Sequence, residues 1–228
     1  MKLRKVLKRT FIALFVIIVL CISALIAIPY FFKDELLQTI KDTVNASING
    51  KFDFEDANLS LLRSFPNASV RVDNYSLEGL GAFEGIPLIK GRAVDVTVDI
   101  WSLLKSDQPM LIRGIDLNQP MVNIQILKDG TANYDIALPD TSTVETEQAP
   151  VEYELNLKKY VIDEGSFFYR DRSTDTEVEI RGLNHTGSAA IKTNLYNLFT
   201  NTQIDTISLA YGNISYLKNA KVDMQADV

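Results

Sequence analysis

The side chains that most often do chemistry in proteins are scarce in this sequence of 228 residues. It contains a single histidine, His185, and a single cysteine, Cys21. A disulfide framework and a multi-histidine metal site each need several such groups, so the composition excludes them. A cysteine–histidine site is excluded because no cysteine lies in residues 33–228. A lone histidine is more often a structural or surface residue than a catalytic one. We therefore expect no enzyme activity, no cofactor and no metal.

An acidic run near two arginines is the other candidate for chemistry. Its carboxylates lack the glycine and the terminal glutamate of a calcium-binding loop, so we interpret the run as the solvent-facing rim of a strand. The sequence also lacks the G-x-x-x-x-G-K-[ST] segment that binds nucleotide phosphates. The acidic residues of the run are Asp171, Asp175, Glu177 and Glu179.

The charge of the chain is divided between two parts. Residues 1–32 hold five basic side chains and no acidic one, which leaves 18 basic and 29 acidic side chains for residues 33–228. An acidic body argues against binding nucleic acid through a basic patch. The basic side chains of the first part are Lys2, Arg4, Lys5, Lys8 and Arg9.

An uncharged stretch of 22 residues, 11–32, follows this basic head. A helix of that length is about 33 Å long and crosses a bilayer core of about 30 Å. The apolar region of a cleaved signal peptide is usually shorter, about 7–15 residues, so we favour a transmembrane helix. Basic residues stay on the cytoplasmic side. We expect a cytoplasmic head at residues 1–10 and an exported body.

The first part of the body, residues 33–50, carries apolar residues on one side of a helix, followed by Gly50 as a stop. Such a helix packs on the core or lies on the membrane surface, and the sequence does not separate these two roles. The apolar positions are Leu36, Leu37, Ile40, Val44 and Ile48.

Beyond Gly50 the apolar residues alternate with polar ones, which is typical of strands with one apolar and one wet face. We expect two β segments, 51–137 and 151–228, separated by a flexible loop over 138–150 that is rich in Pro, Ser and Thr. Short helical turns fit 100–105 and 194–200. The sequence signals for turns lie at 65–67, 79–85, 118–120, 129–130, Gly165 and Gly182.

Two stretches resemble each other, 115–134 and 157–171, which indicates a repeating array. The given sequence ends inside an alternating segment, and an unpaired terminal strand would be an exposed edge. We therefore expect further strands beyond residue 228.

Few helices are predicted to cover the apolar face of so many strands, and such a face must be buried on something. Two solutions stay open: a β-sandwich, in which a second sheet covers the face, and a curved sheet that holds lipid. In the second case the lipid-facing residues are Val70, Val72, Val94, Val96, Val98, Ile100, Val122, Ile124, Ile126, Leu155, Leu157, Phe167 and Tyr169.

In order along the chain, these features resemble the N-terminal region of the AsmA-like family. The resemblance begins with the basic head and single span and continues through the strand at 94–100. It extends to Pro120, Val122 and Ile124, and its most specific part is the run Gly-Ser-Phe-Phe-Tyr-Arg-Asp at 165–171.

This resemblance implies a mainly β fold: a transmembrane helix, a short amphipathic helix and a curved, mostly antiparallel sheet that starts a longer groove. It implies anchoring in the bacterial inner membrane with the body in the periplasm. Family members are similar to chorein-type bridge proteins, which carry phospholipid acyl chains in an apolar groove and support outer-membrane assembly. The alternative is a scaffold with a closed sandwich that contacts envelope proteins.

Overall fold

Strands make up most of the chain in the computed structural model, which describes residues 33–60, 67–103, 110–138, 153–192 and 195–227. The basic head, the predicted transmembrane helix and nearly all of the predicted loop lie outside these ranges. None of the helices within them is long and apolar enough to cross a membrane. The chain divides into two compact units, residues 1–40 and 41–228, and the second contains the whole sheet.

The helix predicted over 33–50 is α2, Lys33–Ser47, which has two acidic residues in its first turn, where the helix dipole favours them. It ends earlier than predicted because Ile48 already pairs with Ala137 and Gly50 already belongs to a strand. The Asn45 side chain ties the end of the helix to that strand: its Oδ1 accepts from the Phe52 N–H at 2.6 Å and its Nδ2 donates to the Phe52 carbonyl at 2.9 Å.

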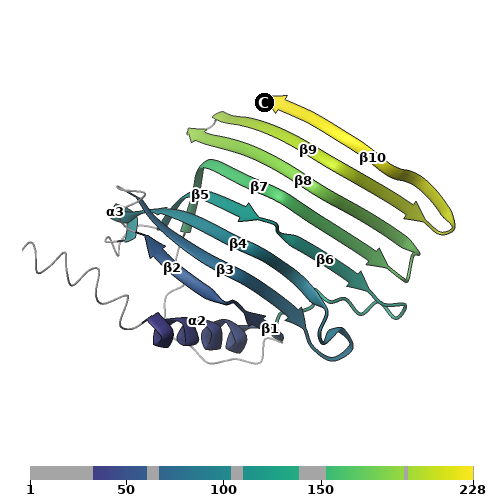
Figure 1. Cartoon of the computed structure of the whole chain (residues 1–228), viewed down its shortest axis with the longest axis horizontal. Helices are drawn as coiled ribbons and strands as arrows, with labels where there is room; N and C mark the ends of the chain where they lie inside the picture. Colours follow the sequence, from purple (N-terminus) through teal and green to yellow (C-terminus); the bar gives the residue numbers. More distant parts are fainter. Residues whose placement is uncertain (1–32, 61–66, 104–109, 139–152, 193–194, 228) are drawn as a thin grey trace, which may run out of the picture. The chain divides into compact units, whose positions relative to one another are not determined.

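All ten described strands join in one sheet, in the order β1-β3-β4-β5-β7-β8-β9-β10 (Figure 1). Neighbours are antiparallel, except that β5 and β6 run parallel to β7. The prediction of a mainly β protein is confirmed. The strands are β1 (Gly50–Asp53), β2 (Asp56–Ser60), β3 (Asn67–Gly79), β4 (Pro87–Asp99), β5 (Met110–Asn118), β6 (Met121–Ile126), β7 (Tyr153–Asp171), β8 (Thr176–Lys192), β9 (Leu195–Tyr211) and β10 (Ile214–Asp227).

Two positions in the order are each filled by a pair of short strands. Both β1 and β2 pair with β3, and both β5 and β6 lie between β4 and β7. Every residue from Gly114 to Asn118 and from Met121 to Ile126 lies opposite the residue 45 positions later, as Gly114 lies opposite Lys159. The strand residues of 115–126 and 160–171, which make up much of the two similar stretches noted in the sequence, are therefore parallel neighbours in register.

Several predicted turns are bends inside the sheet. Gly165 and Gly182 were predicted as turns, but they lie within β7 and β8, and the chain continues through 118–120 from β5 to β6 without reversing. The helical turn predicted at 194–200 is also wrong, because β9 begins at Leu195. The turn at 79–85 holds the short 3-10 helix η1 (Gly81–Phe83), and the tight hairpin at 129–130 is present.

These bends share an unusual backbone conformation. Asn74, Gln119, Glu164 and Gly182 have φ angles between 49° and 61°, in the left-handed region that most residues avoid. Register aligns the first three, because Asp73, Asn118 and Asp163, the residues just before them, lie on one row across the sheet through Ala93.

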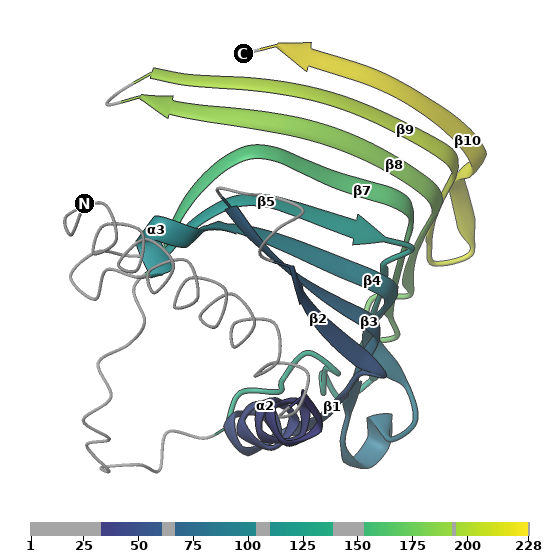
Figure 2. The same cartoon turned by 60° about the vertical axis from the view of Figure 1, so that its left-hand side comes forward.

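Gly182 lies within one residue of the same level, since Ser166 and Gly165 pair with Arg181 and Leu183. Residues in this conformation kink a strand, and the long strands bend part-way along their length (Figure 2). We call these four positions the bend line: Asn74, Gln119, Glu164 and Gly182.

A buried asparagine completes the hydrogen bonds of β6 where this strand extends past the first residues of its neighbour β4. Asn133 is 2% exposed, and its Oδ1 accepts from the Gln125 N–H at 2.8 Å. Its Nδ2 donates to the Asn123 carbonyl at 2.6 Å, and its own N–H donates to the Gln125 carbonyl at 3.0 Å. The Asn133 side chain thus forms hydrogen bonds with backbone groups of β6 that a neighbouring strand would otherwise form.

The substitution Asn133→Ala removes the side-chain partners of the Gln125 N–H and the Asn123 carbonyl together. Leaving two such backbone groups unpaired costs about 2–4 kcal/mol. We expect the free energy of unfolding of the full chain, measured by urea titration in detergent, to fall by that amount, and the urea midpoint to fall with it. The exposed neighbour Asp135→Asn is the control and should leave the midpoint unchanged. Equal midpoints for the two variants would contradict this role of Asn133.

The substitution Gly182→Ala tests the bend line. A Cβ at Gly182 would overlap the Asp205 side chain, including the Cβ of Asp205. The left-handed backbone conformation at this position also costs an alanine about 1–2 kcal/mol. Gly212 has a similar φ of 58° with nothing near the position of its Cβ. Gly212→Ala therefore measures the conformational cost alone, and we expect Gly182→Ala to lower the thermal unfolding temperature further.

Candidate functional site

The two faces of the sheet differ in chemistry. Residues paired across neighbouring strands point to the same face, so each register pair extends a row across the sheet. Val72 pairs with Val94, and Val94 with Leu117. The first row, which contains these residues, is Ala57, Val72, Val94, Leu117, Ile162, His185, Thr202 and Met224.

A second row lies on the other side of the bend line. It is separated from the first by five residues in each strand, for example Ile162 and Phe167 in β7. Strict alternation over five residues would put the two rows on opposite faces. The second row is Phe52, Leu77, Ile89, Val122, Phe167, Ile180 and Ile207.

The packing around Gly165 shows that both rows share a face. A Cβ built on Gly165 would lie 2.7 Å from Cγ2 of Ile162 and 3.5 Å from the Leu183 Cβ, so these side chains lie on the same side. Gly165 in turn shares its face with Phe167, two residues on. The bend line therefore shifts the alternation by one residue and keeps the apolar side chains on one face.

A third row flanks the first and is built around Val70 and Val96, which pair directly. Beyond the second row, Ile124 pairs with Tyr169. The predicted residues Val70, Val72, Val94, Val96, Val98, Val122, Ile124, Phe167 and Tyr169 therefore belong to one apolar face. The third row is Leu59, Val70, Val96, Ile115, Tyr160, Gly187, Thr200 and Ala226.

Four predicted residues have other positions. Ile100 was expected both to end the strand 94–100 and to start a helical turn over 100–105; it begins the helix α3 (Ile100–Leu103), so the helical turn is confirmed and the strand position is wrong. Asp99 ends the strand there, because its Oδ1 accepts from the Trp101 N–H at 2.9 Å. Ile126 lies at the end of β6 opposite Asp171. Leu155 and Leu157 lie near the start of β7, with Leu155 opposite Ile112.

The site prediction omitted Ile115, Leu117 and Ile162, which lie at the centre of the face. Their signal was present in the similarity between 115–134 and 157–171, because that similarity aligns Leu117 with Ile162. If the two similar stretches are taken as parallel neighbouring strands, Leu117 and Ile162 lie side by side between Val94 and β8.

Much of this apolar face is open to solvent. Val98 is 5% exposed, whereas Val70 is 37% and Leu59 is 52% exposed. All the described strands belong to one sheet, so the second sheet of a closed sandwich is not among them. Apolar patches that stay open in a folded protein are typical of sites that bind a partner or ligand.

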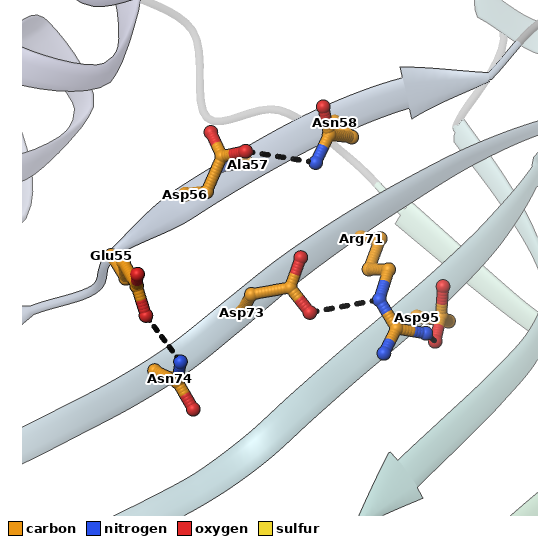
Figure 3. Close-up of polar contacts among 8 residues, drawn as sticks. All are labelled: Glu55, Asp56, Ala57, Asn58, Arg71, Asp73, Asn74 and Asp95. Atoms are coloured by element: carbon orange, nitrogen blue, oxygen red, sulfur yellow. Dashed lines mark hydrogen bonds and ion pairs between the residues drawn. The ribbon is translucent and has the colours of Figure 1, made fainter.

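The opposite face is polar and carries ion pairs (Figure 3). The Arg71 Nε contacts Asp73 and its Nη1 contacts Asp95, each at 2.8 Å. Burial raises the pKa of Asp95, and nearby Asp116 adds to the effect, although Arg71 opposes it. Figure 3 also shows Asn74, at the bend line, bonded to Glu55.

Tyr169 places a hydroxyl at the far end of the apolar face, opposite Ile124. Burial raises the pKa of Tyr169, and the nearby Asp171 carboxylate acts in the same direction. Asp171 itself accepts from the Ser173 hydroxyl at 2.6 Å, which holds the pKa of Asp171 below its usual range.

The residues first considered for chemistry are not gathered into one site. Arg170 pairs with Glu177 at 2.8 Å on the polar face, and Asp171 caps the turn after β7. Within the described ranges, no three histidine, aspartate or glutamate side chains come together as metal ligands do. His185 instead lies half-buried in the first row, with its Nδ1 2.7 Å from the Thr202 hydroxyl.

Comparison with known proteins gives a family but no individual relative. No curated protein matches the chain, and no solved structure matches it. Residues 3–221 match the AsmA family, and this match covers most of the basic head, the uncharged stretch 11–32 and nearly all of the sheet. The chain therefore belongs to the AsmA family.

Proposed function

We propose that this protein shields the acyl chains of membrane lipids on the apolar face of its sheet and passes phospholipid through the periplasm. In this proposal residues 11–32 anchor it in the bacterial inner membrane, and the sheet is the membrane-proximal part of a longer groove. The protein supports outer-membrane assembly without enzyme activity. The observation that carries the proposal is the open apolar face, which crosses the sheet on both sides of the bend line.

The physical gain is the removal of hydrocarbon from water. Each buried methylene of an acyl chain contributes about 0.8 kcal/mol, so a lipid outside the membrane needs apolar cover along its whole length. Successive rows of Val, Leu and Ile offer similar contacts at each step across the sheet. A lipid that moves from row to row exchanges one set of contacts for another, and no step exposes the whole chain.

Site-specific photo-crosslinking tests this proposal. Val70 and Val96 pair directly on the apolar face, and their neighbours Ser69 and Thr97 pair directly on the polar face. A photoreactive amino acid at Val70 or Val96 should capture phospholipid in cells, and one at Ser69 or Thr97 should capture much less. The four positions lie in adjacent pairs on the same two strands, so a difference in lipid capture between them depends on the face alone.

Protein captured at Val70 and Val96, with no lipid, would support the alternative of an envelope scaffold and reject the lipid proposal. Equal lipid capture on both faces would also contradict it, because capture would then report only nearness to the membrane.

A charge on the apolar face should prevent lipid binding. Val96→Glu places a carboxylate among acyl contacts, where an unpaired charge is costly. We expect the full chain, purified in detergent, to retain several-fold less phospholipid by mass spectrometry. Thr97→Glu adds the same charge to the face that already holds Asp95 and Asp99, so it should retain the wild-type amount. Circular dichroism of both variants checks that the sheet still forms.

A further inference from the structure

The apolar face is interrupted where it crosses β7, β8 and β9. There the first row passes from Ile162 to His185 and Thr202, and the third passes from Ile115 to Tyr160 and Thr200. These adjoining rows bring four hydrogen-bonding side chains together within a face of Val, Leu and Ile. We call them the polar cluster: Tyr160, His185, Thr200 and Thr202.

The polar cluster is held in place by packing. The His185 Nδ1 lies 2.7 Å from the hydroxyl of Thr202, which is only 8% exposed. The rings of Tyr160 and His185 have centroids 5.3 Å apart. A Cβ on Gly187 would overlap the Tyr160 ring, so the glycine is what lets the ring lie across β8.

The polar cluster offers hydrogen-bond donors and no carboxylate. The other described members of the first and third rows are apolar or glycine, so no acidic residue shares these rows. Within the described part of the chain, the hydroxyls of Tyr160 and Thr200 make no hydrogen bond. Where Thr202 donates to Nδ1 of His185, the other ring nitrogen carries the proton and is a donor as well.

A donor-rich, acid-free cluster fits a ligand that is an acceptor with several oxygens, and a phosphate group matches this best. The carboxylates of this acidic chain repel free anions, whereas a phosphate attached to acyl chains gains apolar contact on Ile115 and Ile162, which lie opposite Tyr160 and His185 of the polar cluster. We propose that the polar cluster binds the phosphate of a phospholipid whose acyl chains lie on the neighbouring apolar rows. This inference rests on the proposed lipid-shielding function.

The single histidine gives a direct test, because its imidazole ¹⁵N signals need no assignment in a chain without a histidine tag. The full chain in a phosphate-free detergent is titrated with dioleoyl-phosphatidylglycerol, dioleoylglycerol or inorganic phosphate. The phospholipid should shift the His185 signals, and the other two should leave them in place. An equal shift with inorganic phosphate would overturn the inference in favour of a site for free anions.

Binding of the two lipids by variants supplies the second readout. Thr202→Val keeps the shape of the side chain but removes the partner of His185, and it should weaken phosphatidylglycerol binding about tenfold. Binding of dioleoylglycerol should not change, because it depends on apolar contact. Thr186→Val, the same change at an exposed residue on the opposite face of β8, is the matched control and should leave both affinities unchanged.

The outcomes separate the two proposals. If both lipids bind and Thr202→Val weakens neither, the polar cluster is not a phosphate site, and the lipid-shielding function stands. If neither lipid binds the wild-type chain, the lipid-shielding function itself fails.

Discussion

The structure depends on the backbone hydrogen bonds that join ten strands edge to edge in one sheet. Such a sheet satisfies its backbone groups internally, but it covers neither of its own faces. The polar face is compatible with water because it carries charged side chains, such as Arg71, Asp73 and Asp95. The apolar face has no equivalent within the described sheet, and its need for cover is the physical basis of the proposed function.

The bend line reconciles two demands on this sheet. Long strands such as β7 and β8 have to bend, yet their apolar side chains have to stay on one side. A left-handed residue at Glu164 or Gly182 does both, because it kinks the strand and shifts the alternation by one position. The apolar face is consequently continuous from Ile162 to Phe167, although the spacing of these residues breaks the period of two.

This shift explains what the sequence predicted and what it did not. Alternating residues such as Val94, Val96 and Val98 identified the strands and the face, since a period of two indicates a strand with one apolar face. The same rule misread Gly165 as a turn, because a break in the period marks either a strand end or a bend. Ile100 was misplaced because the Asp99 cap, a local hydrogen bond, overrides the pattern. The parallel pairing of β5 and β6 with β7 is a long-range contact, and its only trace was the weak internal similarity.

The row of left-handed residues also bears on how such a sheet can evolve. On each side of the bend line the side chains alternate between the two faces, and the two alternations are offset by one residue, like two reading frames. Losing a single residue from the middle of β7 would turn every later side chain of that strand over, exchanging Phe167 with its polar neighbours. Insertions and deletions are therefore expected to be tolerated in the hairpins, while within strands the sheet grows or shrinks by whole repeats, such as the 45-residue step that relates β5 and β6 to β7.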